Sequence, residues 1–125
     1  LQTNNRKIYT DKALKLSNDN RLAFIIQYIR EHLHESLSVE TLSKKACMSE
    51  SNFYRVFKNE LGISPVDFIN TERIKLAVSL LQDPNKKIKN VYLECGFESR
   101  SYFNRVFKRM NQISPGAFQA KAAQH

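Results

Sequence analysis

Apolar residues recur every three or four positions along most of the chain, which predicts a succession of amphipathic helices. The first helix is expected to begin near Asp19, a residue type that caps helix N-termini. Its apolar face consists of Leu22, Ile25, Ile26, Ile29 and Leu33. A short helix is expected to follow from Ser38. Its inward face consists of Val39, Leu42 and Ala46.

A third helix is predicted after a turn at Cys47 and Met48, with Ser49 as its cap and Gly62 at its end. Its inward residues are Phe53, Val56 and Phe57. Ser64 and Pro65 then start a longer helix. That helix is expected to run to about Leu81, before Asp83 and Pro84 stop it. Its apolar positions are Val66, Ile69, Leu76, Ala77, Leu80 and Leu81.

The pattern then starts again, and two stretches match at a spacing of 50 residues. Ser-x-Ser-x-Phe-x-Arg-Val-Phe-Lys occurs at 49–58 and again at 99–108, and Ile-Ser-Pro follows at 63–65 and 113–115. Each repeat has a short helix, a tight turn and a longer helix capped by serine. This layout is typical of a helix-turn-helix, so the repeat predicts two such units in an all-α fold.

The longer helix of each unit separates apolar from polar residues. At 100° per residue, the apolar set of the second copy points one way: Phe103, Val106, Phe107 and Met110. Ser101, Arg105 and Lys108 point the opposite way, as do their counterparts Ser51, Arg55 and Lys58. A charged outer face is usually only solvated surface. Its recurrence at matching positions favours a function, and hydrogen-bond donors with positive charge suit DNA bases and phosphates.

The charge of the chain agrees with a polyanionic partner. The formal net charge is +8 over 125 residues. The second long helix has no acidic residue between Ser99 and Met110, whereas Glu50 and Glu60 balance the first, so the second unit is expected to attract DNA more strongly. The lysines just before its short helix add to this charge: Lys86, Lys87 and Lys89.

Catalytic and metal-binding motifs are lacking in the sequence. His32 and His34 are interpreted as surface residues on a helix edge, and Cys47 and Cys95 as small buried residues in a reducing cytoplasm. No glycine-rich phosphate loop, paired-carboxylate motif or nucleophile elbow occurs. We therefore expect no enzymatic activity, no cofactor, no metal and no membrane span.

From about Asp19 to Phe118 the chain resembles the DNA-binding domain of AraC/XylS-type bacterial transcription regulators. Three motifs of the second unit carry this resemblance: the Gly96-Phe97 turn, the helix with Phe103-x-Arg-x-Phe-Lys108, and the restart at Ser114-Pro115. The resemblance implies about seven helices within residues 19–120, in two helix-turn-helix subdomains at about 38–61 and 87–110. A linker helix at 65–81 would join them.

The resemblance also implies that one chain places two recognition helices, about 49–61 and 99–110, in successive major grooves of double-stranded DNA. The base-reading positions it implies are Ser51, Asn52, Tyr54, Arg55, Arg100, Ser101, Asn104 and Arg105. By chemistry Arg55 and Arg105 are the strongest of these, because arginine reads guanine through two hydrogen bonds. The phosphate-binding candidates are Ser38, Lys58, Ser64 and Lys108.

Three residues depart from the family pattern. Tyr92 stands where the family usually has a small alanine at a close helix crossing, so its ring must swing outward or push the helices apart. Cys47 occupies the turn position that is Gly96 in the second unit, which requires a strained backbone or another turn. Lys87 replaces the usual capping residue before Ile88.

The first residue is not methionine, and we expect the chain to be part of a longer protein. Residues 1–18 are expected to be an interdomain linker and 121–125 a tail. Effector binding and dimerisation would belong to a further N-terminal domain, and RNA polymerase would be a partner. The alternative function is a basic helical module that binds protein or RNA.

Overall fold

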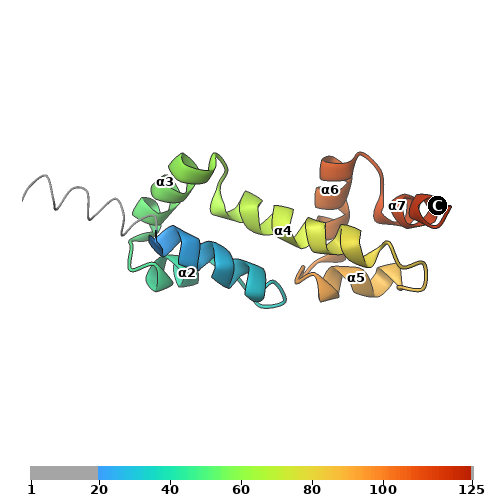
Figure 1. Cartoon of the computed structure of the whole chain (residues 1–125), viewed down its shortest axis with the longest axis horizontal. Coiled ribbons are helices and arrows are strands. Elements are labelled where there is room, and N and C mark those ends of the chain that lie inside the picture. The colour runs from blue at the N-terminus through green and yellow to red at the C-terminus, as the bar shows by residue number, and fades with distance from the viewer. Residues whose placement is uncertain (1–19, 125) are drawn as a thin grey trace, which may run out of the picture. The chain divides into compact units, whose positions relative to one another are not determined.

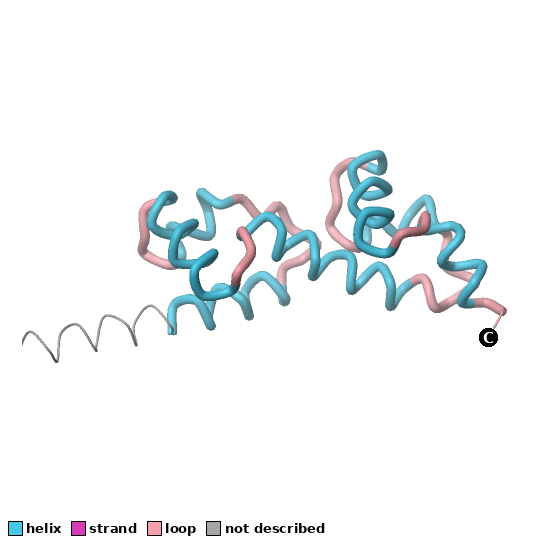
Figure 2. The backbone as a smooth tube through the Cα atoms, turned by 90° about the horizontal axis from the view of Figure 1, so that it is seen from above, coloured by secondary structure: helices cyan, strands magenta, loops and turns pink. Residues whose placement is uncertain are grey.

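The computed structural model describes residues 20–124, which form helices joined by short loops and no strand (Figure 2). Seven helices lie in this part of the chain, which confirms the all-α class. The first spans residues 20–31, and the others are α2 (Val39–Lys45), α3 (Glu50–Leu61), α4 (Pro65–Leu80), α5 (Ile88–Glu94), α6 (Arg100–Asn111) and α7 (Pro115–Ala122) (Figure 1). The expected cap Asp19 and the linker 1–18 lie outside the described residues.

The helices divide between two compact units. Within the described residues, the first unit holds 20–31 and 38–65, and the second holds 32–37 and 66–124. Except for Pro65, the helix predicted to link the subdomains therefore belongs to the second unit. Helix α7 also continues to Ala122, two residues into the expected tail.

The core of the first unit comes from the apolar faces that the sequence predicts. Its buried apolar residues are Leu22, Ile25, Ile29, Leu42, Ala46, Phe53, Val56 and Phe57. In α3, the Phe53 and Phe57 rings lie 5.5 Å apart between centroids, as expected for residues one helical turn apart. The Lys45 ammonium of α2 lies 4.6 Å from the centre of the Tyr28 ring, which ties α2 to the first helix.

Serine caps and left-handed residues set the ends of the two long helices. The hydroxyl of Ser49 accepts a hydrogen bond from the Asn52 amide at 3.2 Å, and Ser99 does the same for Tyr102. Helix α3 ends at Gly62 with φ at 79°, as predicted, whereas α6 ends at Gln112 with φ at 64°. The two repeats thus start alike and end with different residues.

A row of phenylalanine rings forms much of the core of the second unit. Phe103 lies 5.3 Å from Phe97 and 5.8 Å from Phe107, and Phe107 meets Phe118 of α7 edge-on at 5.7 Å. The remaining buried members are Ile74, Ala77, Leu81, Val91, Cys95 and Val106. The buried face of α6 is the one that the sequence predicts.

Helix α4 buries Ile69 and Ala77 as predicted, but its other buried residues differ from the prediction. Val66 is 49% exposed, while Ile74, which the apolar list omitted, is buried. The polar side chains of Asn70 and Glu72 are buried as well. Helix α4 therefore buries polar as well as apolar side chains, and a pattern of apolar positions alone could not define its buried surface.

Residues 32–37 form a loop that is held against the second unit. The Arg73 guanidinium donates to the carbonyl oxygens of Leu33 at 3.1 Å and Glu35 at 2.8 Å, and His34 Nδ1 donates to the Glu94 carbonyl at 2.8 Å. The first helix ends at residue 31, so the prediction that His32 and His34 lie on a helix edge is wrong. These contacts use groups far apart in sequence, which explains why the helical period missed them.

The turn of the first unit contains the strained backbone that the sequence suggested. Cys47 follows Ala46, the C-cap of α2, with φ at 57°, and Gly96 follows Cys95, the C-cap of α5, with φ at 95°. Cys47 is exposed, so its prediction as a buried residue is wrong. A left-handed residue directs its side chain differently from a helical one, and here the thiol lies at the surface.

The other two departures from the family pattern are Tyr92 and Lys87, both in the second unit. Tyr92 is half-buried against the core of the second unit, with its ring 6.5 Å from Phe103. Its counterpart in the first unit is the buried Ser43. Lys87 makes no side-chain cap for α5, whereas Ser38 caps α2 by accepting from the Thr41 amide at 3.1 Å.

Replacing Cys47 by glycine is expected to raise the free energy of unfolding by about 0.5–1 kcal/mol. A left-handed residue with a Cβ costs roughly 1–2 kcal/mol, from which the greater freedom of glycine in the unfolded chain subtracts about 0.5–1 kcal/mol. Urea unfolding of the two proteins measures the difference. Cys47→Ala is the control, because it removes the thiol and keeps the Cβ. Equal stability of the glycine and alanine variants would contradict the strain.

Candidate nucleic-acid interface

Helix α6 presents a continuous polar face opposite its phenylalanine core. Every base-reading residue predicted on it is exposed, and so are the neighbouring cations: Arg100, Ser101, Asn104, Arg105, Lys108 and Arg109. The residues between them are Phe103, Val106 and Phe107, which are buried. Core packing thus fixes the rotation of the helix and, with it, the direction in which the polar face points.

Helix α3 repeats this arrangement in the first unit. Ser51, Tyr54, Arg55 and Lys58 are exposed and Asn52 is half-buried, while the phenylalanine side of the helix lies in the core. The residues predicted from the sequence are therefore brought together on one face in each unit. Whether they read bases stays a prediction.

Each face contains a contact that holds its central arginine. In α3 the Arg55 guanidinium donates to Asn52 Oδ1. In α6 the Arg105 Cζ lies 5.6 Å from the centre of the Tyr102 ring, within range of a cation–π interaction. Tyr102 was not among the predicted site residues. The signal was available in the repeat, because Tyr102 stands 50 residues after Asn52.

The two faces differ in charge in the predicted direction. Helix α6 carries exposed arginine and lysine with no acidic residue, whereas α3 contains Glu50 and Glu60. The lysines before α5 contribute less than expected, since Lys86 forms an ion pair with Glu94 at 3.1 Å. The excess positive charge of the second unit therefore lies mainly on α6.

The two serines predicted near phosphates, Ser38 and Ser64, lie at the starts of α2 and α4, where the backbone amides are the predicted phosphate contacts. Ser38 Oγ accepts from the Thr41 amide and donates to the Thr41 hydroxyl at 2.9 Å. Ser64 directly precedes Pro65, the first residue of α4. The helix-terminal amides remain the more suitable groups for a phosphate in both places.

Burial controls the chemistry of the ionisable groups inside the second unit. It raises the pKa of the Cys95 thiol to about 12, and the nearby Glu94 carboxylate acts in the same direction. The thiol is therefore protonated and unreactive at neutral pH. Burial also lowers the pKa of the Arg73 guanidinium, which Glu98 partly opposes.

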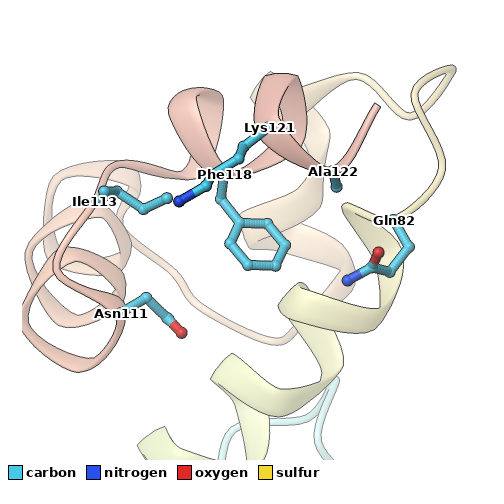
Figure 3. A pocket seen from close by; sticks show the side chains of 6 residues that line it. All are labelled: Gln82, Asn111, Ile113, Phe118, Lys121 and Ala122. Carbon is cyan, nitrogen blue, oxygen red and sulfur yellow. The ribbon is translucent and has the colours of Figure 1, made fainter. Parts of the chain in front are cut away.

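A cavity of about 380 Å³ lies in the second unit (Figure 3). Its lining residues are Gln82, Asn111, Ile113, Phe118, Lys121 and Ala122. None of the predicted DNA-contacting residues lines it.

In residues 20–124 no three His, Cys, Asp or Glu side chains are grouped to hold a metal ion. The same residues include no helix of the length and apolarity needed to cross a membrane.

Known proteins match the chain over both helix-turn-helix motifs. A helix-turn-helix domain family matches residues 42–121. The chain is 36% identical over 112 residues to the probable transcriptional regulator LumQ of Photobacterium leiognathi, covering 90% of this chain and 44% of LumQ. It spans less than half the length of LumQ and of the other curated relatives it matches, such as the regulator MtrA of Neisseria gonorrhoeae.

Solved structures agree with the sequence matches. The DNA-binding domain of AdpA, a global transcriptional factor solved with a target DNA, has a TM-score of 0.76 at 35% identity, covering 80% of this chain and 90% of that one. A regulator with an AraC-type DNA-binding domain from Chromobacterium violaceum has a TM-score of 0.75 at 27% identity, covering 85% and 95%. The chain therefore belongs to the AraC-type family of helix-turn-helix DNA-binding domains found in transcriptional regulators.

Proposed function

We propose that this chain binds double-stranded DNA sequence-specifically and forms the DNA-binding part of a bacterial transcription regulator. One observation carries the proposal: two helices, α3 and α6, expose the same Ser, Arg and Lys positions opposite the same buried Phe, Val and Phe positions. Packing alone requires only the buried half of this repeat. The repeated polar half has the donors and charge that suit base edges and phosphates.

In this proposal, the two arginines contribute most of the base discrimination. Arg55 and Arg105 each reach guanine O6 and N7 with two hydrogen bonds, which are worth about 1–3 kcal/mol against other bases. Asn104 reads adenine, since an amide can both donate and accept. Asn52 Oδ1 accepts a hydrogen bond from Arg55, so Asn52 positions this arginine in addition to contacting a base. The further base contacts are Ser51, Tyr54, Arg100 and Ser101.

The remaining contacts fix the chain on the DNA backbone. Lys58 and Lys108, with the helix starts at Ser38 and Ser64, bind phosphates. Each unit inserts its recognition helix into the major groove, and successive grooves on one DNA face lie about 34 Å apart. A single chain would then read two half-sites that other helix-turn-helix proteins read as a dimer.

The wider setting of the chain follows from what its relatives are. We propose that it acts in the cytoplasm together with RNA polymerase, and that effector binding and dimerisation reside in another part of a longer protein. The relatives are regulators more than twice the length of the matched region, which supports this division. The same relationship argues against enzymatic activity.

Removing Lys108 tests the phosphate contacts. Lys108→Ala should weaken binding to all duplexes by a similar factor and reduce the slope of log affinity against log salt by about one, because one fewer counterion is released. Fluorescence anisotropy over a series of salt concentrations gives the slope. Lys121→Ala is the matched control, because it removes an exposed lysine of α7 that is not among the predicted DNA contacts. An unchanged slope for Lys108→Ala would remove it from the contacts.

A gel-shift assay separates this proposal from the alternative of a basic module for protein or RNA. Labelled genomic fragments compete with random duplex DNA and with single-stranded RNA at increasing salt. Sequence-specific binding predicts that some fragments outlast random duplex as salt rises, since base contacts are less screened than phosphate contacts. If no fragment does so at any salt, the proposal fails. RNA that outcompetes every duplex would favour the alternative.

A further inference from the structure

We propose that Tyr102 is the positioning residue for Arg105 and that it occupies the place which Asn52 holds for Arg55. The inference rests on the proposed function, because its consequence is the base preference of α6. It begins from the repeat: Tyr102 and Asn52 both stand three residues before their arginine and three residues after their capping serine. Residues three apart on a helix are neighbours on its surface.

The two residues hold their arginines by different chemistry. Asn52 accepts a hydrogen bond from the Arg55 guanidinium, whereas Tyr102 offers the face of its ring, 5.6 Å from the Arg105 Cζ. A cation over a tyrosine ring at this distance is attracted to the negative face of the ring. A guanidinium attracted to a ring face uses none of its N–H groups in a hydrogen bond to the ring, so these groups can donate to a base edge.

Tyr102 is itself fixed from behind by α4. Asn70, which is only 4% exposed, donates a hydrogen bond from Nδ2 to the Tyr102 hydroxyl at 2.7 Å. The Tyr102 ring also packs against Phe97, with centroids 6.0 Å apart. An isolated surface tyrosine would move among rotamers, but a ring anchored at its hydroxyl and along its edge presents one face. Tyr102 remains 37% exposed, and it belongs to the same helix as Arg105.

A merely structural tyrosine would give a different pattern of effects. If Tyr102 only packed, its loss would weaken all DNA binding uniformly through instability of the second unit. As a positioning residue it changes the preference at the base pair that Arg105 reads and leaves other positions unchanged. Its effect also disappears once Arg105 is gone. These two signatures separate the roles.

The first test needs no DNA. In the free chain, the side-chain NMR signals of Arg105 are expected to show the upfield shift of groups over an aromatic ring. Tyr102→Phe keeps most of this shift, because the ring and its contact with Phe97 remain, and Tyr102→Leu abolishes it. Asn52→Leu, in the other unit, leaves it unchanged. An Arg105 signal that is the same in the parent chain and in Tyr102→Leu overturns the proposal, whether or not the chain binds DNA specifically.

The second test measures base preference on a bound duplex and on its three single-base variants at each position. Tyr102→Leu should reduce discrimination at a single position by roughly two- to fivefold, the equivalent of an exposed cation–π contact. Tyr102→Phe retains most of the discrimination, and in an Arg105→Ala background Tyr102→Leu adds no further loss of discrimination. A uniform loss at all positions, or equal losses for the Leu and Phe variants, overturns the proposal. A parent chain with no base preference defeats the proposed function, while the NMR result still decides the contact.

Discussion

Gly96→Ala is expected to destabilise the protein by about 3–4 kcal/mol. A Cβ at this position would lie 1.7 Å from the Leu33 carbonyl oxygen, and the φ of 95° already disfavours any residue with a side chain. The loop must move away, which breaks its bond to Arg73 Nε. The unusual φ costs roughly 1–2 kcal/mol, and a lost hydrogen bond to a charged group about 1.5–3 kcal/mol.

The chain contains a matched control for this prediction. Gly62 has a φ of 79°, and nothing lies within 4 Å of where its Cβ would be. Gly62→Ala should therefore cost only the backbone term, about 1 kcal/mol. Urea unfolding of both variants gives the comparison. Equal losses for the two alanines would show that the close approach of Gly96 to Leu33 does not hold in solution.

Arg105→Ala is expected to lose about 1–3 kcal/mol of binding free energy on the preferred duplex and to relax the choice of base at one position. Its guanidinium is exposed on the α6 face and lies over the Tyr102 ring. Helix α6 has no acidic residue that could pair with it, so its N–H groups can donate to a base. The measurement is the affinity for the preferred site and for every single-base variant of that site.

Arg109→Ala is the control for charge alone. Arg109 is exposed on the same helix, and its substitution removes the same positive charge. It is not one of the predicted base-reading residues. It should weaken all duplexes similarly and leave the preferred bases unchanged. If Arg105→Ala behaves in the same way, Arg105 contacts a phosphate and the base contact is assigned wrongly.

The repeated helices were the most predictable part of the structure. Their inward faces follow from the spacing of residues such as Phe53 and Phe103, and the capping serines Ser49 and Ser99 place their starts. These signals are local, so a helical period and a cap are enough to read them. The outward position of Arg55 and Arg105 then follows from the geometry of the helix.

The features that the sequence did not reveal depend on contacts between distant segments. Arg73 holds carbonyls 38 and 40 residues before it, and Asn70 reaches Tyr102 over 32 residues. No local pattern encodes such pairs. Cys47 shows a related difficulty: its residue type suggested burial, but the left-handed turn places it at the surface.

Selection of binding sites from a pool of random duplexes tests the central claim most directly. The chain is incubated with the pool at a salt concentration that suppresses non-specific binding, and the retained DNA is sequenced after several rounds. Sequence-specific binding by two recognition helices predicts convergence on one motif with two blocks of fixed bases about one helical turn, roughly 10 base pairs, apart. A retained pool with the base composition of the input would contradict sequence-specific recognition.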